Sequence, residues 1–180
     1  VKLVYTGPPN GRSFLYRGQC WRLSGITFQN GIWRYPDPRP AWNGNVGLEI
    51  EGSKNTGKLD CGPLAFLNFD TAILASLIPG VKGHGDQNAF GKVWSDGNRV
   101  FYGSDNPQAV NTTFEHLAVN GTTEVVFDIR VGGFIGCNLL GLNNPALLWR
   151  FHNASPNSDD FWIHHLRVDP ACNGWRIAEN

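Results

Sequence analysis

The sequence contains no methionine, has no net charge and has few charged residues of either sign. The 15 lysines and arginines balance 15 aspartates and glutamates, and charged residues make up 17% of the chain, below the about 25% of average soluble domains. A nucleic-acid-binding surface needs concentrated positive charge, and the sequence has no basic run. No stretch approaches the ~20 apolar residues of a membrane-spanning helix. We therefore expect neither a nucleic-acid partner nor insertion into a membrane.

Targeting and nucleotide-binding signals are also missing. The chain begins at Val1 without a visible signal peptide, so we expect either a removed leader or a part of a longer chain. The glycine-rich segment Gly132–Gly136 opens no predicted helix, which argues against a phosphate-binding loop. Glycosylation sequons begin at Asn111, Asn120 and Asn153. Such triplets also arise by chance, so they are compatible with a secreted glycoprotein without requiring one.

The cysteines include no C-x-x-C pair, which argues against a zinc or thioredoxin-type site. There are four, at widely spaced positions: Cys20, Cys61, Cys137 and Cys172. An even number of separated cysteines is typical of secreted domains that are stabilised by disulfide bonds. Three pairings are possible, and we favour Cys20–Cys61 with Cys137–Cys172 because sequence neighbours pair most simply. The alternative is four free, buried thiols in a cytosolic protein; we expect a secreted or extracellular location, which includes the cell surface.

What the sequence has in abundance favours strands and turns: 22 glycines, 11 prolines and 7 tryptophans. Alternating apolar and polar residues predict strands most clearly at Glu124–Val131, Leu147–His152 and Phe161–Val168. Asp96-Gly97 is typical of a two-residue hairpin turn, here between strands at 93–95 and 99–102. Weaker strands are predicted at Leu3–Thr6, Ser13–Tyr16, Trp21–Phe28, Ile32–Tyr35, Val46–Glu51 and Phe114–Val119.

One segment, Thr71–Ile78, is a candidate helix. Asp70 can cap its first turn, alanines and leucines favour it, and Pro79-Gly80 would end it. The apolar run that starts at Leu64 fits a buried strand equally well. About ten short strands separated by turn signals, without an internal repeat, predict one all-β domain over residues 1–180. We expect a two-sheet antiparallel β-sandwich of the jelly-roll type with at most one short helix.

A resemblance to a known group of proteins lies near the carboxyl end. Leu148-Trp149-Arg150-Phe151-His152-Asn153, a polar loop and then Asp160–Val168 resemble the closing hairpin of jelly-roll carbohydrate-binding modules of the galactose-binding-like superfamily. The resemblance covers about 20 residues and is one of pattern. It implies binding of a glycan or polysaccharide and a structural calcium ion near the chain ends.

Aromatic residues in a proline-rich loop are the first candidates for a ligand site. Three prolines within Trp33–Asn43 exclude a central strand, so we expect a surface loop in which exposed rings stack on sugars at a low entropic cost. The hairpin around Asp96-Gly97 adds two further rings. The alternatives are a small core beneath the loop and ordinary cross-strand packing of the aromatic rings. The candidate ligand-binding residues are Trp33, Arg34, Tyr35, Trp42, Asn43, Trp94 and Tyr102.

Two arrangements would support catalysis instead. Arg150, His152 and His164 on one concave sheet would suit a small polysaccharide lyase, with arginine neutralising a uronate and histidine moving the proton. Glu49 and Glu51 are two residues apart on a predicted strand and could form the carboxylate pair of a glycosidase. A solvated glutamate face and histidines without a catalytic role are the more common outcomes, and we favour them.

Oxygen-rich side chains in the loop Asn157–Asp160 could bind Ca²⁺ together with Asp169, and Asp159 and Asp160 are the candidate ligands. The sequence therefore predicts a secreted, lectin-like domain that binds an oligosaccharide or polysaccharide without catalysis. The alternatives are a small β-sandwich polysaccharide lyase or glycosidase, and a structural or adhesive surface domain that binds protein.

Overall fold

The computed structural model describes residues 1–19, 21–31, 43–52, 57–79, 85–106, 109, 111–121, 124–129, 134–143, 147–151, 160–168 and 176–179. All regular structure in these residues is β-strand. None of the described residues forms a helix that is long and apolar enough to cross a membrane. The strands are β1 (Lys2–Tyr5), β2 (Arg12–Tyr16), β3 (Arg22–Leu23), β4 (Ile26–Asn30), β5 (Val46–Gly52), β6 (Asp60–Cys61), β7 (Leu64–Leu67), β8 (Thr71–Leu77), β9 (Ala89–Asp96), β10 (Val100–Ser104), β11 (Thr112–Asn120), β12 (Val125–Ile129), β13 (Phe134–Asn143), β14 (Leu147–Phe151), β15 (Asp160–Val168) and β16 (Arg176–Glu179).

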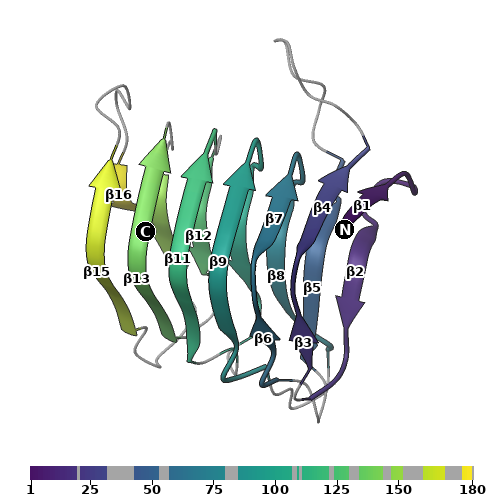
Figure 1. Ribbon diagram of the computed structural model, residues 1–180, viewed down its shortest axis with the longest axis horizontal. Helices are drawn as coiled ribbons and strands as arrows, with labels where there is room; N and C mark the ends of the chain where they lie inside the picture. Colours follow the sequence, from purple (N-terminus) through teal and green to yellow (C-terminus); the bar gives the residue numbers. More distant parts are fainter. Residues whose placement is uncertain are drawn as a thin grey trace.

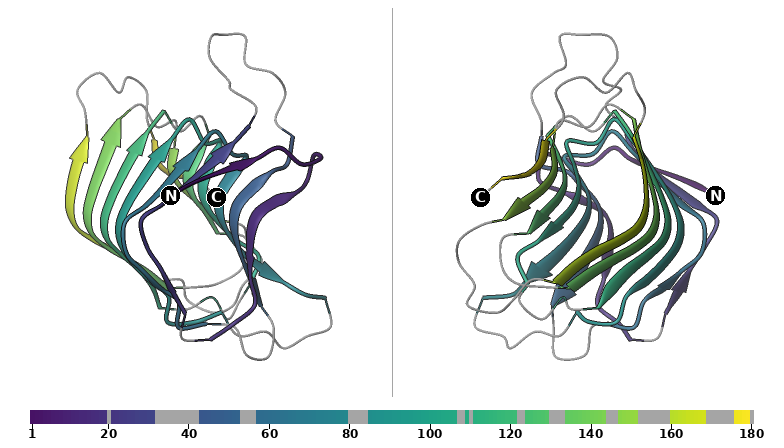
Figure 2. Two further views of the ribbon diagram at one scale, coloured as in Figure 1. Left: turned by 45° about the vertical axis from the view of Figure 1, so that its right-hand side comes forward. Right: turned by 90° about the vertical axis from the view of Figure 1, so that its left-hand side faces the viewer.

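The chain winds between two parallel sheets. Sheet A has the order β1-β4-β7-β9-β11-β13-β15, with β3 and β6 beside this path, and sheet B has the order β16-β14-β12-β10-β8-β5-β2. Each strand pairs with the strand one coil earlier or later, and all of these pairs among the described strands are parallel. The two sheets face each other across the interior (Figures 1 and 2). The fold is a β-solenoid, so the prediction of an antiparallel jelly-roll sandwich is wrong.

Like side chains stack from coil to coil because parallel pairing places equivalent positions beside each other. Phe28 stacks on Phe66 with ring centroids 5.1 Å apart, and Phe90 stacks on Phe114 at 4.9 Å. Both pairs lie in one hydrophobic cluster that receives side chains from both sheets. Strands buried in this way are typically almost continuous apolar runs, as in Val125–Ile129, which is buried at every position. The core therefore runs along the solenoid as columns of stacked side chains.

The coils are a structural repeat that the sequence conceals. Ile73 pairs with Tyr102, Tyr102 with Phe127, and Phe127 with Trp149. These residue numbers differ by 29, 25 and 22, so the coil length varies and no fixed period appears. The stacked residues are alike only in being apolar and large. A sequence without a visible internal repeat therefore folds into coils that repeat in the structure.

The tight turns at which the chain passes from sheet A to sheet B explain why the hairpin predicted at Asp96-Gly97 does not form. Asp96-Gly97 joins β9 to β10, which lie in different sheets. Gly97 has φ 66°, and the matching positions Asn68 and Gly121 have φ 64° and 60°. The Asn68 amide donates to the Asp96 carbonyl (3.1 Å), and the Gly97 amide donates to the Asn120 carbonyl (3.1 Å). The turn signal is real, but it marks a corner at which the chain changes sheets.

Two other elements also differ from the expectations. Thr71–Ile78 is not a helix: its residues form β8 between β5 and β10, with Ala72, Ile73 and Ala75 fully buried. Pairing on both sides outweighs the helix propensity of alanine and leucine, and the alternative of a buried strand is confirmed. The proposed closing hairpin is absent, because β14 pairs with β12 and β16 in sheet B, whereas β15 pairs with β13 in sheet A.

A ladder of ion pairs ties successive coils together next to sheet B. Arg99 Nε lies 3.0 Å from Asp70 Oδ1, and Arg99 Nη1 lies 2.6 Å from Glu124 Oε2. Arg150 Nη1 lies 2.8 Å from Glu124 Oε1. Burial opposes ionisation of Glu124, but hydrogen bonds from the two arginines outweigh it and lower the pKa of this carboxyl. The four residues come from successive coils, so the ladder opposes separation of the coils.

We expect Glu124→Gln to lower the free energy of unfolding by about 1–2 kcal/mol at pH 7, because it leaves Arg99 and Arg150 without their shared charged acceptor. The folded-state pKa of Glu124 is depressed, so its contribution is complete above the ordinary value of 4.5 and is lost as the pH falls through the folded value. Urea unfolding at pH 7 and at pH 3 measures this difference, with the exposed Glu115→Gln as control. An equal loss at both pH values would contradict the ladder's electrostatic role.

Candidate functional site

The predicted ligand loop lies mostly outside the described residues, which include none of Trp33, Arg34, Tyr35 and Trp42. Asn43 is described, and its Oδ1 accepts a hydrogen bond from the Asn45 amide at 3.3 Å. Its carbonyl accepts another from the Asn10 amide at 2.7 Å. Asn43 therefore helps to shape the turn that leads into sheet B.

The two aromatic residues predicted around Asp96-Gly97 lie in contrasting places. Trp94 is 48% exposed on β9 of sheet A. Tyr102 is fully buried on β10 of sheet B, with its ring edge against Phe114, and burial raises the pKa of its hydroxyl to about 12. The structure therefore separates them: Trp94 is available to a ligand, and Tyr102 belongs to the core.

Trp94 lies on the outer face of sheet A, the face that points away from the core. Along β9, Phe90, Val93 and Ser95 are buried, whereas Lys92 and Trp94 between them are exposed. Parallel pairing carries this pattern across neighbouring strands, so the outward positions form rows that run along the solenoid. One row is Ala65, Trp94, Ala118, Gly141 and Arg167; the next is Lys92, His116, Leu139 and His165.

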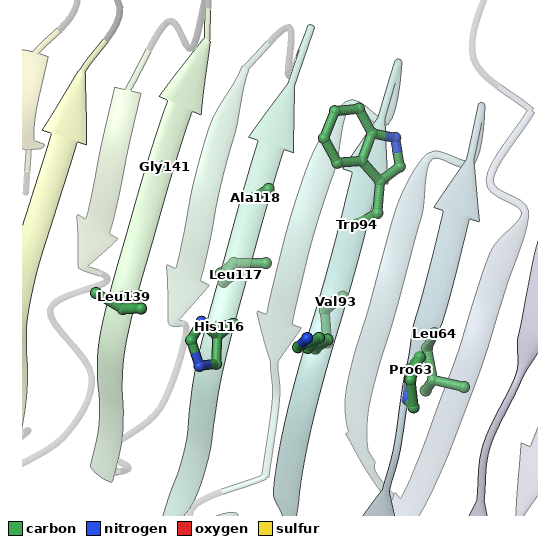
Figure 3. A pocket seen from close by; sticks show the side chains of 10 residues that line it. Pro63, Leu64, Val93, Trp94, His116, Leu117, Ala118, Leu139 and Gly141 are labelled. Carbon is green, nitrogen blue, oxygen red and sulfur yellow. The ribbon is translucent and has the colours of Figure 1, made fainter.

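A shallow hollow of about 410 Å³ lies beside Trp94, and we call it the Trp94 groove. In Figure 3 the indole stands on β9, with Ala118 and Gly141 at the same level on the next two strands and His116 and Leu139 below them. A Cβ atom added at Gly141 would meet nothing within 4 Å. Small side chains beside a large ring thus create the groove. It is lined by Pro63, Leu64, Lys92, Val93, Trp94, His116, Leu117, Ala118, Leu139 and Gly141.

A second hollow, of about 550 Å³, lies at the other end of the same strands, and we call it the Trp162 groove. The Trp162 ring covers Gly136 on the neighbouring strand so closely that an added Cβ would be 2.2 Å from Cζ2. The His164 ring lies against the indole, with centroids 4.4 Å apart. Glu115 and Asn138 also line this groove, and both are exposed. The outer face of sheet A therefore has two tryptophans, on β9 and β15, beside shallow, partly polar hollows.

The residues of the two catalytic hypotheses do not assemble into one site. Arg150 lies on sheet B and binds Glu124, whereas His164 is exposed on sheet A, and His152 lies outside the described residues. Arg150 and His164 therefore do not share the concave face that the lyase hypothesis required.

The proposed carboxylate pair is held by arginines. Glu49 is only 3% exposed, and it accepts hydrogen bonds from Arg12 and from the Ser76 hydroxyl. Glu51 pairs with Arg17, whose Nε lies 2.6 Å from Oε1. The expectation of a solvated glutamate face is wrong for Glu49, and the ion pairs give both carboxylates a structural role.

The disulfide prediction is wrong for the two cysteines that the structure describes. Cys61 and Cys137 are free and buried, and they lie in the core column that also contains Phe90 and Phe114. Cys20 and Cys172 lie outside the described residues. The thiols act as small apolar side chains in the stack, which is the alternative of free, buried thiols.

The calcium prediction also falls outside what the structure describes, since Asp159 and the side chain of Asp160 are not included. Among the described side chains, no three or more of His, Cys, Asp and Glu gather in a way that could hold a metal ion. Calcium at Asp159 and Asp160 stays a prediction.

Sequence reasoning missed several residues of the outer face, including Lys92, His116, Trp162 and Arg167. No local pattern in its own segment marks any of these residues as part of a site. They come together in rows only because β9, β11, β13 and β15 pair in register. An alignment of the segments 89–96, 112–120, 134–143 and 160–168 with each other was the one signal that could have revealed them. Comparisons with protein-family models, curated proteins and solved structures found no match.

We expect Cys61 and Cys137 to resist alkylation in the folded protein. Burial raises the pKa of each thiol to about 12, so almost no thiolate, the reactive form, is present at pH 8. Iodoacetamide labelling followed by peptide mass spectrometry should show both sites unmodified in buffer and fully modified in 6 M guanidinium chloride. Labelling of either site within minutes under native conditions would contradict their place in the core.

Proposed function

We propose that this protein binds an extended carbohydrate chain along the outer face of sheet A, without catalysis. The observation that carries the proposal is the exposed Trp94 indole beside a groove whose floor is made of Ala118 and Gly141. The proposal keeps the predicted secreted or extracellular location, where many polysaccharides are found.

The chemistry of the two grooves suits sugars. The exposed Trp94 and the half-buried Trp162 offer apolar ring faces against which the C–H groups of a sugar can pack. Polar groups that can bind hydroxyls line the same hollows: Lys92 and His116 in the Trp94 groove, Glu115 and Asn138 in the Trp162 groove. An apolar surface with a few polar groups is typical of ligand sites.

The spacing of the strands suits a chain better than a compact ligand. Neighbouring strands lie about 4.8 Å apart, close to the length of one sugar in an extended chain. Equivalent positions on β9, β11, β13 and β15 therefore repeat at about the interval of successive sugars. A chain that lies across the strands, along the solenoid, would meet similar surroundings at each step.

A second candidate function is binding of a protein through the same face. Leu139 on β13 is 39% exposed and Trp94 on β9 is 48% exposed, and both contribute apolar surface to the Trp94 groove. Apolar side chains gathered on one face are typical of protein-binding surfaces. A substitution that fills the groove beside Trp94 distinguishes the two candidates. It should prevent glycan binding, which requires an open groove, and it need not prevent protein binding.

We expect Gly141→Phe and Trp94→Ala each to weaken glycan binding at least about tenfold, the first by filling the groove and the second by removing its stacking surface. Glycan-array screening followed by calorimetry on the best oligosaccharide measures the effect. Gly141→Ala is the matched control, since a methyl group at this position meets no atom within 4 Å.

Thermal unfolding should show that all three variants fold. A protein that binds no glycan on the array, or Gly141→Phe binding as tightly as the parent, would overturn the proposal. If Gly141→Phe binds glycan as tightly as the parent and also retains a protein partner, the second candidate is favoured.

A further inference from the structure

The two grooves differ in charge. The ten residues that line the Trp94 groove include Lys92 and His116 and no aspartate or glutamate. A smaller hollow of about 180 Å³ continues from it, shares Gly141 and contains Arg167. The described residues that line the path from Trp94 over Gly141 to Arg167 are therefore basic, apolar or, at Asn143, neutral and polar, and none is an aspartate or glutamate.

Carboxylates on this face of sheet A lie off that path or are already bound. Asp60 and Glu115 line the Trp162 groove, and Asp60 lies 2.7 Å from the Arg22 guanidinium. Asp96 accepts a hydrogen bond from the Asn120 side chain at 3.1 Å. Lys92 and Arg167, by contrast, are exposed and form no ion pair with any described residue. Among the described residues, those that line the Trp94 groove therefore carry positive charge and no carboxylate, and Asp96 and Glu115 lie beside the groove and not in its lining.

We propose that the carbohydrate bound in the Trp94 groove is an acidic polysaccharide, with carboxylates on its sugars that pair with Lys92 and Arg167. This inference rests on the proposed function and specifies its ligand. Lys92 lies on β9 and Arg167 on β15, three strand spacings or roughly 14 Å apart along the solenoid. A stretch of about four sugars spans this distance, with one ring over Trp94 and a carboxylate at each end.

The pairing of the strands beneath the groove favours a polysaccharide over an acidic peptide as the ligand. Peptides that bind to sheets usually pair their main chain with an exposed edge strand. The Trp94 groove lies over β9, β11 and β13, each of which is paired on both sides. At the groove, residues 93–94, 116–118 and 139–141 are paired with strands on both sides, so recognition there depends on ring stacking and side-chain charge.

The test compares an oligogalacturonate of four to six sugars with the same oligomer after full methyl esterification, which removes the charge and keeps the backbone. Calorimetry at 20 mM and 300 mM NaCl should show tighter binding of the acidic form, and this advantage should shrink at high salt because the charges are exposed. Lys92→Gln and Arg167→Gln should each weaken binding of the acidic form about two- to fivefold, the value of an exposed ion pair, and leave the ester unaffected.

Lys2→Gln is the control for net charge, since Lys2 is exposed on β1 at the far end of sheet A. Equal affinity for the acid and the ester would overturn this inference and leave the proposed function standing. Failure of both forms and of every neutral glycan would overturn the proposed function itself. Polyglutamate of matched charge binding as tightly as the oligogalacturonate would show that charge alone is recognised, and it would also overturn the inference.

Discussion

Parallel pairing in register between successive coils is the constraint on which the rest of the structure depends. It places each side chain beside the equivalent side chain of the next coil, so an apolar position becomes a column such as Phe90, Phe114 and Cys137. Within such a column every residue needs neighbours of compatible size, because interiors are closely packed. The same constraint applies to charge: Asp70, Arg99, Glu124 and Arg150 alternate in sign from coil to coil, and like charges at those positions would repel.

The same register also arranges the side chains on the outer face of sheet A. There, the core does not restrict which residue types are allowed. Val93 and Ser95 are fixed by the core, whereas Trp94 between them contacts only its own face, so its identity is free of packing demands. Where the outward row carries Ala118 and Gly141 next to Trp94, the surface is hollow. Where Trp162 covers Gly136, the ring fills the space that a side chain at position 136 would need. The grooves are thus made by differences in side-chain size along rows whose spacing the backbone sets.

Sequence patterns located most strands but not their partners. The pattern of apolar residues identified the strands at Val46–Gly52, Val125–Ile129 and Leu147–Phe151 within a few residues, because this pattern lies within a single segment. Whether a strand pairs with the next strand or with one a coil away depends on contacts between residues 22 to 29 positions apart, for example Tyr102 with Phe127. Asp96-Gly97 suits a hairpin and a corner equally, since both need a positive φ at Gly97. The cysteines were misinterpreted because number and spacing do not reveal that Cys61 and Cys137 occupy apolar columns.

The candidate site was only partly predictable for the same reason. Trp94 was identified because an exposed aromatic ring next to a turn is visible in one segment, and Tyr102 was included with it because a hairpin would have placed both on one surface. In a solenoid those two strands belong to different sheets, so the pair separates and Trp94 gains new neighbours from β11 and β13. The shape of such a row can change one coil at a time: replacing Gly141 alters one step of the groove while Leu140 and Leu142, its buried neighbours in the chain, keep the core intact. The outer face and the core thus use alternate residues of the same strands, and this separation lets a groove lined by basic and apolar residues form on a chain without net charge.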